Sequence, residues 1–433
     1  MKLFRGGVHP PQQKNTAEKT TVAMGVPSVV LIPMVQHSGA PCRPLVKKGD
    51  TVKVGQVIGD TDAYVSAPIH SSVSGTVTKV EPMLLSGSRP VMCVEIKPDG
   101  LQQVSEEVKP PVVDSRESFL AAVRASGLTG LGGAGFPTHV KLNPPKGARV
   151  DILIIDAAEC EPYLTSDYRE CIENTDRVVE GILQVMKWTG IQKAMIGIED
   201  NKPKAVRVLK QAVSGIQSIS VHPVPTRYPQ GAEKMLIYTL TGREVPSGGL
   251  PADVGCIVMN VASVAFVASY LKTGMPLVKK RVTVDGSAVA NPQNVEVLIG
   301  TPLREVFEFC GGFKSEPGKV IMGGPMMGVS QYSLDLPVLK YTNALLAFDK
   351  KESSIPEESP CIRCARCVRA CPMRLLPFEL DRLVKARKYE DAEKLHIMTC
   401  IECGCCVYVC PAKRLMVQSI RIGKDYIRRN RKK

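Results

Sequence analysis

The sequence predicts a multidomain protein that combines an α/β domain with smaller β modules and a helical, cysteine-rich domain. The chain has 433 residues, more than one ordinary hydrophobic core accommodates, so several domains are expected. Strand-like and helix-like patterns alternate in the middle of the chain and indicate an α/β domain there. Eight of the fifteen cysteines belong to one motif that occurs twice near the C-terminal end.

The composition is that of an ordinary globular protein, with 44% hydrophobic and 23% charged residues. The net charge of +14 is uneven, because residues 421–433 hold seven basic side chains and one acid, Asp425. A basic tail of this kind is either a solvated segment or a contact for anionic lipid or an acidic partner protein. Nucleic acid is not expected as a partner, because the sequence has no aromatic-interleaved basic patch and no zinc-finger spacing.

The sequence is expected to have no transmembrane segment of its own. Its longest apolar stretch, residues 256–271, is interrupted by Asn260, Ser263 and Ser269 and is shorter than the roughly 20 residues that a spanning helix needs. The first residues, MKLFRGGVHPP, lack the apolar core of a secretory signal. Clustered thiols without such a signal favour metal binding in the reducing cytoplasm over a disulfide framework.

Residues 1–105 are predicted to form a small β domain. Strand-like alternation recurs in Thr51–Ile58 and in Ser74–Val80, and glycines separate the segments. This region resembles the barrel-sandwich hybrid of biotinyl and lipoyl carriers. Those carriers need a lysine at the tip of a central hairpin, and this chain has none between Lys53 and Lys79. The resemblance therefore implies a structural or docking role and not a swinging cofactor arm.

The α/β domain is predicted for residues 114–275. Ser115 is expected to cap a helix that runs through Ser126 and ends at Gly127. Two apolar segments predict buried strands and two amphipathic segments predict helices, an alternation that favours a largely parallel sheet covered by helices. The predicted strands are Ile152–Ala157 and Ala194–Ile198, and the predicted helices are Arg177–Lys187 and Pro203–Val213.

Two further regions complete the expected domain order. Residues 279–345 are predicted to form a second β module with one helix, Leu303–Phe309. The cysteine-rich domain is predicted at 358–420, and the basic tail follows at 421–433. Between the cysteine motifs, two apolar stripes with helical spacing predict two helices. The residues of these stripes are Phe378, Leu380, Leu383 and Val384, followed by Tyr389, Ala392 and Leu395.

The cysteine motif predicts iron–sulfur clusters. Each copy has the spacing C-x2-C-x2-C-x3-C-P, which is that of bacterial two-cluster ferredoxins. A structural zinc site takes four ligands, usually as two separated C-x2-C pairs, so this longer repeated motif favours two [4Fe–4S] clusters over zinc. The first copy contains Cys361, Cys364, Cys367 and Cys371, and the second contains Cys400, Cys403, Cys406 and Cys410.

The same motif predicts crossed ligation, because its fourth cysteine ligates the other cluster. One cluster is expected on Cys361, Cys364, Cys367 and Cys410, and the other on Cys371, Cys400, Cys403 and Cys406. Cys405 lies outside the spacing and is expected to be a bystander thiol. The whole segment resembles the helical ferredoxin domains that are built into larger respiratory proteins.

A glycine-rich loop, residues 127–135, is the strongest candidate for a nucleotide or flavin phosphate site. It contains a G-x-G-x-x-G pattern, but a helix precedes it and Pro137 follows, which disfavours a standard Rossmann site. Five glycines in nine residues allow the backbone to lie against a ligand and to direct N–H groups at a phosphate. Lys141 would then pair with that phosphate. The alternative is a merely flexible loop.

The segment GLGGAGFPTHVK resembles the GRGGAGFPTGLK loop of the flavin-bearing, NADH-oxidising subunit of respiratory complex I. Segments at Asp156–Pro162, Tyr228–Glu233 and Met259–Val261 resemble the N-A-D-E-x-E-P, Y-x-x-G-E-E and N-N-V segments of that family. The resemblance implies an FMN site, with NADH stacking near Phe136 and contacting Glu161. The residues that it implies for FMN are Gly130, Lys141, Asp156, Glu159, Tyr228, Glu233 and Asn260.

Some positions depart from the complex I pattern. Leu131, His139, Asp156 and Ala158 stand where that family has arginine, glycine, asparagine and aspartate. The departures concern the dinucleotide contacts more than the flavin contacts. For each acid in these segments, the alternative interpretation is a solvated or helix-capping carboxylate.

From end to end, the chain resembles the RnfC family, which belongs to Rnf complexes, the membrane-bound ferredoxin:NAD oxidoreductases. The order of four modules agrees: a barrel-sandwich hybrid, a Rossmann-like FMN/NADH domain, a β-grasp module called SLBB, and a helical domain with two [4Fe–4S] motifs. The resemblance implies a peripheral subunit on the cytoplasmic side of the membrane. Such a subunit would exchange electrons between NAD(H) and the other subunits of the complex, and indirectly with ferredoxin.

The cofactors explain why no catalytic acid, base or nucleophile is expected. NADH delivers two electrons as a hydride, whereas a [4Fe–4S] cluster accepts one electron at a time, and a flavin converts between the two. Two alternatives remain open from the sequence. One is a soluble, cobalamin-reductase-like flavoprotein, and the other is a non-catalytic iron–sulfur adaptor that has lost nucleotide binding.

Overall fold

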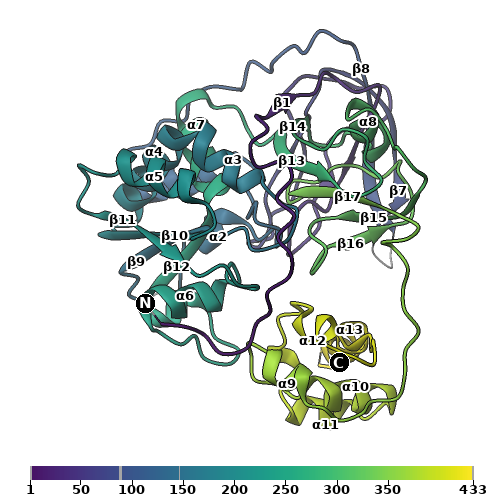
Figure 1. The fold of residues 1–433 in the computed structure, drawn as a ribbon. Helices are drawn as coiled ribbons and strands as arrows, with labels where there is room; N and C mark the ends of the chain where they lie inside the picture. Colours follow the sequence, from purple (N-terminus) through teal and green to yellow (C-terminus); the bar gives the residue numbers. More distant parts are fainter. Residues whose placement is uncertain (1, 87–89, 146, 432–433) are drawn as a thin grey trace.

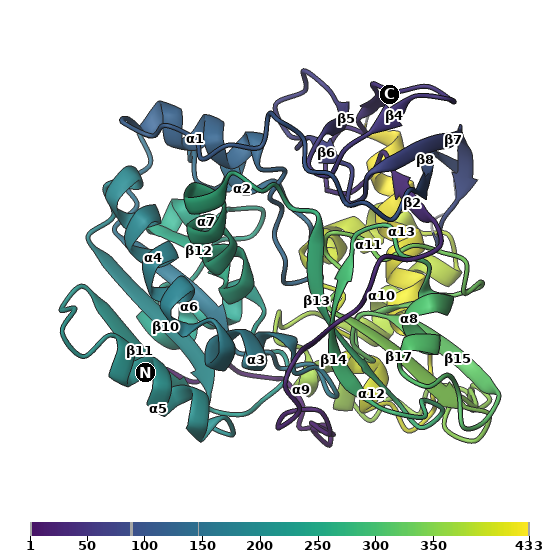
Figure 2. The same ribbon diagram turned by 90° about the horizontal axis from the view of Figure 1, so that it is seen from above.

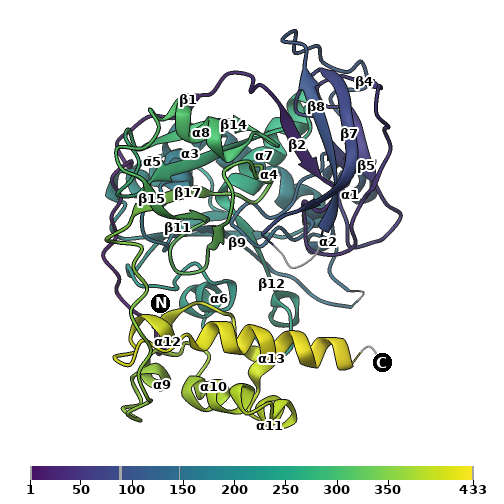
Figure 3. The ribbon, with the colours of Figure 1, turned by 90° about the vertical axis from the view of Figure 1, so that its right-hand side faces the viewer.

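The computed structural model describes residues 2–86, 90–145 and 147–431. Seen from above, the α/β domain lies on one side of the molecule and the two β modules lie on the other (Figure 2). The helical, cysteine-rich domain lies below them (Figures 1 and 3). Within the described ranges, no helix combines the length and apolar character needed to cross a membrane.

The middle of the chain forms the parallel α/β domain that the alternating patterns predict. Its strands are β9 (Ile152–Ala157), β10 (Lys193–Glu199), β11 (Ile219–Val224) and β12 (Cys256–Asn260). Its helices are α1 (Arg116–Ala125), α2 (Thr138–Lys141), α3 (Ser166–Glu173), α4 (Thr175–Thr189), α5 (Pro203–Ala212), α6 (Glu233–Thr241) and α7 (Val261–Thr273), with a 3-10 turn η1 (Pro251–Val254). All strands pair in parallel, in the order β11-β10-β9-β12.

Both faces of this sheet are buried, as expected for parallel strands. Leu153 and Ile155 point into a large core that is completed by α1, α3, α4, α5 and α7. Ile154 points to the other face and packs against α6. The start of α1 also agrees with the prediction, because the Ser115 side chain accepts the backbone N–H of Ser118 in a capping box.

The strand order reverses next to β9, because β10 and β11 lie on one side of it and β12 lies on the other. Ligands of open α/β sheets bind at the carboxyl ends of the strands at such a switch point. Asp156 in β9 is in register with Asn260 at the end of β12. Two of the residues predicted for FMN are therefore neighbours at this edge.

The small β domain consists of two facing sheets. Its strands are β2 (Val30–Pro33), β3 (Arg43–Pro44), β4 (Thr51–Val52), β5 (Val57–Asp60), β6 (Ile69–His70), β7 (Gly75–Leu84) and β8 (Pro90–Pro98). The orders are β2-β8-β7-β4 and β3-β5-β6, and the core between the sheets includes Ile32, Ile58 and Ile96. Residues 2–21 do not belong to this domain, although the sequence assigned them to it; they extend along the other domains (Figure 1).

The second β module is a six-stranded mixed sheet in the order β1-β14-β13-β17-β15-β16. Its elements are β1 (Val22–Ala23), β13 (Lys279–Asp285), β14 (Gln293–Leu298), β15 (Pro317–Met322), β16 (Val329–Gln331), β17 (Ala344–Asp349) and the predicted helix α8 (Leu303–Phe309). Leu303 and Phe307 of α8 pack on the sheet. The sheet extends past the predicted end at residue 345 and includes β1 from the N-terminal region.

The cysteine-rich domain is helical. Its elements are α9 (Arg366–Ala370), α10 (Pro377–Lys385), α11 (Tyr389–Lys394), η2 (Ile397–Thr399), α12 (Cys405–Tyr408) and α13 (Met416–Asn430). The two predicted apolar stripes form α10 and α11. The boundary expected at residue 420 is wrong, because α13 continues through it with Ile420, Gly423 and Ile427 buried against the domain.

Candidate functional site

A cavity of about 840 Å3 opens at the carboxyl edge of the parallel sheet. Its walls come from three domains: the α/β domain, the β7–β8 hairpin of the small β domain, and the sheet and loops of the second β module. The cavity is lined by all nine residues that the sequence predicts for FMN and NADH. They are Gly130, Phe136, Lys141, Asp156, Glu159, Glu161, Tyr228, Glu233 and Asn260.

The glycine-rich loop forms a closed turn at the cavity wall. The Gly130 N–H donates to the Phe136 carbonyl at 2.8 Å, and the Gly135 N–H donates back to the Gly130 carbonyl at 3.2 Å. A Cβ added to Gly132 would lie 3.2 Å from the Asn260 amide, so a side chain there would press on the cavity wall. In the described part of the chain, the backbone N–H groups of residues 132–134 have no hydrogen-bond partner, and they are free to bind an anionic ligand.

Lys141 lies across the cavity from this loop on the short helix α2. Its Nζ donates to Glu233 Oε2 and to the Val258 carbonyl, both at 2.9 Å. A lysine ammonium has three protons, so one remains for a bound anion. The pairing with Glu233 holds the ammonium at the cavity wall.

Burial raises the pKa of three carboxyl groups in the cavity, Asp156, Glu161 and Asp167, to about 7. Asp167 was not predicted, because no motif or spacing in the sequence marks it. Its Oδ2 accepts the Asn260 amide N–H at 2.7 Å, and the oxygen of that same amide caps α7 by accepting the Ala262 N–H. Carboxyl and amide groups of this kind match a polyhydroxyl chain such as the ribityl group of a flavin.

The two glutamates of the acid segment have different partners. The Glu159 carboxylate accepts the backbone N–H groups of Asp167 at 2.7 Å and Tyr168 at 3.2 Å, in the first turn of α3. This is the helix-capping alternative. The Glu161 carboxylate accepts the N–H groups of Met326 at 3.0 Å and Met327 at 2.9 Å. Glu161 therefore connects the α/β domain to the 323–328 loop of the second β module, and the NADH contact stays a prediction.

This 323–328 loop, between β15 and β16, is part of the site that sequence patterns did not identify. A Cβ on Gly324 would lie 2.3 Å from the Glu161 carboxylate, so glycine is required for the close approach. Tyr341 and Asn343 of the same module also line the cavity. Their contribution depends on the packing of two modules that are far apart in sequence.

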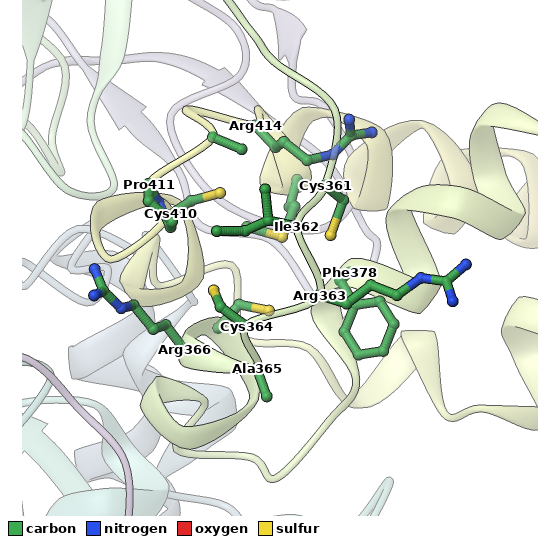
Figure 4. A pocket seen from close by; sticks show the side chains of 13 residues that line it. Cys361, Ile362, Arg363, Cys364, Ala365, Arg366, Phe378, Cys410, Pro411 and Arg414 are labelled. Atoms are coloured by element: carbon green, nitrogen blue, oxygen red, sulfur yellow. The ribbon is translucent and has the colours of Figure 1, made fainter.

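Two smaller cavities lie within the cysteine loops. The first is lined by Cys361, Cys364, Cys367 and Cys410, and Figure 4 shows Cys361, Cys364 and Cys410 around it. The second is lined by Cys371, Cys400, Cys403, Cys405 and Cys406. These groupings agree with the predicted crossed sets, although the ligand roles remain a prediction. The sulfurs surround a space: among the described residues, no three Cys, His, Asp or Glu side chains are close enough to hold a single metal ion.

The large cavity and the second cysteine loop share a wall. Ile401 lines both of them. Tyr228 is 1% exposed and packs in one apolar cluster with Cys160, Cys403 and Cys405. Its phenol oxygen has no hydrogen-bond partner in the described part of the chain. The first cysteine loop lies farther out, with Cys361 exposed to solvent.

Four family models match the chain in succession. The model described as the RnfC barrel sandwich hybrid domain matches residues 2–101, and the Nuo51 FMN-binding domain matches residues 123–269. The SLBB domain matches residues 281–330, and the 4Fe-4S dicluster domain matches residues 360–413.

Curated relatives are similar over nearly the whole chain, and each is the component designated C of a redox complex. The one from the Na(+)-translocating ferredoxin:NAD(+) oxidoreductase complex of Acetobacterium woodii is 46% identical over 99% of this chain and 98% of its own length. The one from the proton-translocating ferredoxin:NAD(+) oxidoreductase complex of Clostridium ljungdahlii is 47% identical over 91% of this chain and 87% of its own length. The one from the ion-translocating oxidoreductase complex of Rhodobacter capsulatus is 39% identical over 91% and 77%, respectively.

A solved structure shares part of the fold. The NAD+-reducing [NiFe]-hydrogenase in the H2-reduced state aligns with a TM-score of 0.50 at 19% identity. The alignment covers 72% of this chain and 62% of the hydrogenase chain, so this chain spans less than two thirds of that protein. At this identity the likeness concerns the fold alone.

Proposed function

We propose, from the premise that this chain belongs to the RnfC family of ion-translocating ferredoxin:NAD(+) oxidoreductase complexes, that it carries electrons between NAD(H) and the rest of such a complex. FMN and two [4Fe–4S] clusters are its cofactors, in keeping with the FMN-binding and dicluster models that it matches. The observation that carries the proposal is the shared wall: Ile401 lines both the large cavity and the second cysteine loop.

The cavity residues fit a bound flavin mononucleotide. The unpaired N–H groups of residues 132–134 and the remaining proton of Lys141 are suited to its phosphate. Asp156, Asp167 and Asn260 are suited to its ribityl hydroxyls. The walls from the two β modules enclose the cavity and restrict water, which favours direct hydride transfer over side reactions.

FMN, when bound, would accept a hydride from NADH and pass electrons on singly, which neither NADH nor a cluster does alone. The protein's part in this chemistry is to orient the reactants and to hold the cavity next to the clusters. Phe136 lies in the cavity wall, where its ring is available to stack against the nicotinamide. No side chain needs to transfer a proton in this step.

The positions of the cysteine loops support an order for the two clusters. The cluster on Cys371, Cys400, Cys403 and Cys406 would be next to the flavin, because its loop shares the cavity wall. The cluster on Cys361, Cys364, Cys367 and Cys410 would pass electrons to another subunit, because Cys361 is exposed and the neighbouring Ile362 is 68% exposed.

The surface around this first loop favours an acidic partner. Residues 360–378 contain no acid, and they include four exposed arginines. These are Arg363, Arg366, Arg369 and Arg374. Charge complementarity of this kind speeds the association of weakly bound redox partners. We place this face toward another member of the complex and the whole chain at the cytoplasmic side of the membrane, as a peripheral subunit.

Cofactor analysis of anaerobically isolated protein tests the proposal. About one FMN and about eight iron atoms per chain are expected, and NADH should reduce the clusters as seen by EPR. Protein that holds zinc in the cysteine loops would contradict the cluster assignment. Iron-replete protein that binds no flavin and does not oxidise NADH would reduce the function to that of a non-catalytic adaptor.

A further inference from the structure

The first residues of the chain lie between the α/β domain and the cysteine-rich domain. In Figure 1 the dark purple segment starts near α6, passes next to the cysteine-rich domain and continues up to β1. Phe4 and Val8 are each only 5% exposed, so the segment is packed and not loosely attached. We call residues 4–14 the N-terminal strap.

One end of the strap contacts the second cluster loop. The Gly7 N–H donates to the Ala370 carbonyl at 2.8 Å, directly before Cys371. Among the described residues, this is the one backbone hydrogen bond that joins residues 358–431 to the rest of the chain. Gly6 has a φ of 80°, and a Cβ on it would lie 2.6 Å from the Cys371 carbonyl oxygen. The close contact therefore requires glycine.

The middle of the strap contacts the cavity wall. Val8 and Tyr228 exchange two backbone hydrogen bonds, Val8 N–H to the Tyr228 carbonyl at 2.8 Å and the reverse at 2.9 Å. The Val8 side chain packs in the same apolar cluster as Tyr228 and Cys403. Arg227 holds the strap from the side, because its guanidinium lies 4.8 Å from the Phe4 ring centre and donates to the Phe4 carbonyl at 2.9 Å.

The other end of the strap holds the acid segment of the cavity. Lys14 Nζ donates to the carbonyls of Glu159 at 2.9 Å, Glu161 at 2.8 Å and Leu164 at 2.8 Å. These bonds use all three protons of the ammonium group. Nearby, the Tyr163 N–H donates to the Gln12 carbonyl at 2.9 Å. The segment that carries both cavity glutamates is thus fixed by the strap.

We propose that the N-terminal strap is a positioning element for electron transfer, which holds the flavin cavity and the second cluster loop at a fixed separation. The inference rests on the proposed function for the identity of the cofactors. Its contacts join Cys371, Tyr228 and the Glu159–Leu164 segment through eleven consecutive residues. The linker before the cysteine-rich domain is too exposed to serve this purpose, since residues 354–361 have no buried member.

The physical reason is the distance dependence of electron transfer. Transfer between two cofactors slows steeply as the gap between them widens, so a small displacement of the cysteine-rich domain would lower the rate without changing either cofactor. Hydride transfer from NADH occurs within the cavity and does not depend on that gap. The strap therefore affects one step of the reaction and leaves the other intact.

The variant Gly6→Ala separates these steps. Its added Cβ meets backbone atoms of Cys371 and Pro372, which forces the strap and the cluster loop apart. The matched control is Gly25→Ala, because a Cβ on Gly25 meets no atom within 4 Å. Rapid-mixing measurements should show cluster reduction by NADH slowed roughly 10- to 100-fold in Gly6→Ala. NADH oxidation with ferricyanide, which takes electrons from the flavin, should equal that of the control.

Hydrogen exchange supplies a readout that needs no cofactor. Residues 225–231 and 366–373 should exchange faster in Gly6→Ala than in Gly25→Ala, in cofactor-free as well as loaded protein. If Gly6→Ala fails to assemble, Phe4→Ala loosens the strap under Arg227 without touching the cluster loop and should shift both readouts in the same direction.

Equal cluster-reduction rates and equal exchange in the variant and the control would overturn the strap. A uniform loss of both NADH-dependent activities would also overturn it, because that result describes a general folding defect. Wild-type protein without any flavin-to-cluster transfer would refute the proposed function instead. In that case the exchange data alone decide, and unchanged exchange in Gly6→Ala would overturn the strap.

Discussion

Removing a single cysteine from each motif distinguishes crossed from uncrossed ligation and also tests the order of the clusters. Cys410 belongs to the second motif but lines the first cavity, together with Cys361, Cys364 and Cys367. Its substitution in Cys410→Ala should remove the first cluster, so that iron falls from about eight to about four atoms per chain. Because the remaining cluster is the one beside the flavin cavity, NADH should still reduce it at the wild-type rate.

The complementary variant should lose the same amount of iron but behave differently. Cys371 lines the second cavity, so Cys371→Ala should retain the first cluster and lose the one that shares a wall with the flavin cavity. Dithionite should still reduce the remaining cluster, whereas reduction by NADH should become slow. The matched control is Cys405→Ala, which removes a buried thiol of the same loop that lies outside the ligand spacing and should keep both clusters.

Iron and sulfide analysis combined with EPR of NADH-reduced and dithionite-reduced protein provides the assay. The reasoning is refuted if Cys410→Ala loses the cluster that NADH reduces first, because each motif would then hold its own cluster. Loss of a cluster in Cys405→Ala would equally refute the ligand sets.

Three further predictions concern the cavity and the surface. Lys141→Ala should weaken FMN binding by about tenfold or more, because it removes a charge-assisted bond to the phosphate, whereas exposed Lys193→Ala should not; equal flavin content in the two variants would contradict the phosphate placement. The pKa values of Asp156, Glu161 and Asp167, about 7 in the fold, lie above their ordinary values of 3.8 to 4.5, so the unfolded chain releases these protons first. The free energy of unfolding of flavin-free protein should therefore fall as pH rises from about 4 to about 7, and Glu161→Gln should reduce that slope in urea titrations; an unchanged slope would disprove the role of Glu161. Reversing the charges of Arg363 and Arg366 to glutamate should slow electron delivery to an acidic redox partner roughly tenfold at low salt, and the difference from Lys193→Glu should shrink as ionic strength rises; a salt-independent effect would exclude the basic docking face.

Local signals in the sequence were sufficient for the elements and for the metal chemistry. Period-3.6 stripes predicted α10 and α11, and the apolar run at residues 152–157 predicted β9, because these patterns report which faces are buried. The cysteine spacing also predicted the crossed grouping that the two small cavities show, since the fourth cysteine of each motif follows from geometry within a short loop. Motif resemblance predicted the nine residues that line one cavity.

Long-range packing decided the rest. Asp167 and the 323–328 loop enter the cavity only because separate domains meet there, and Glu161 contacts Met326 across that junction instead of standing free. The basic tail looked like solvated chain because it is highly charged, but Ile420 and Ile427 bury it as helix α13.

The amino-acid sequence by itself determined which elements form, which thiols group together and which loop is suited to a phosphate, because each of these depends on residues close together in the chain. Only the tertiary structure decided what lies between the flavin cavity and the clusters. Gly7, Tyr228 and Ala370 are far apart in the chain, and their hydrogen bonds depend on how folded domains pack, which no local pattern encodes.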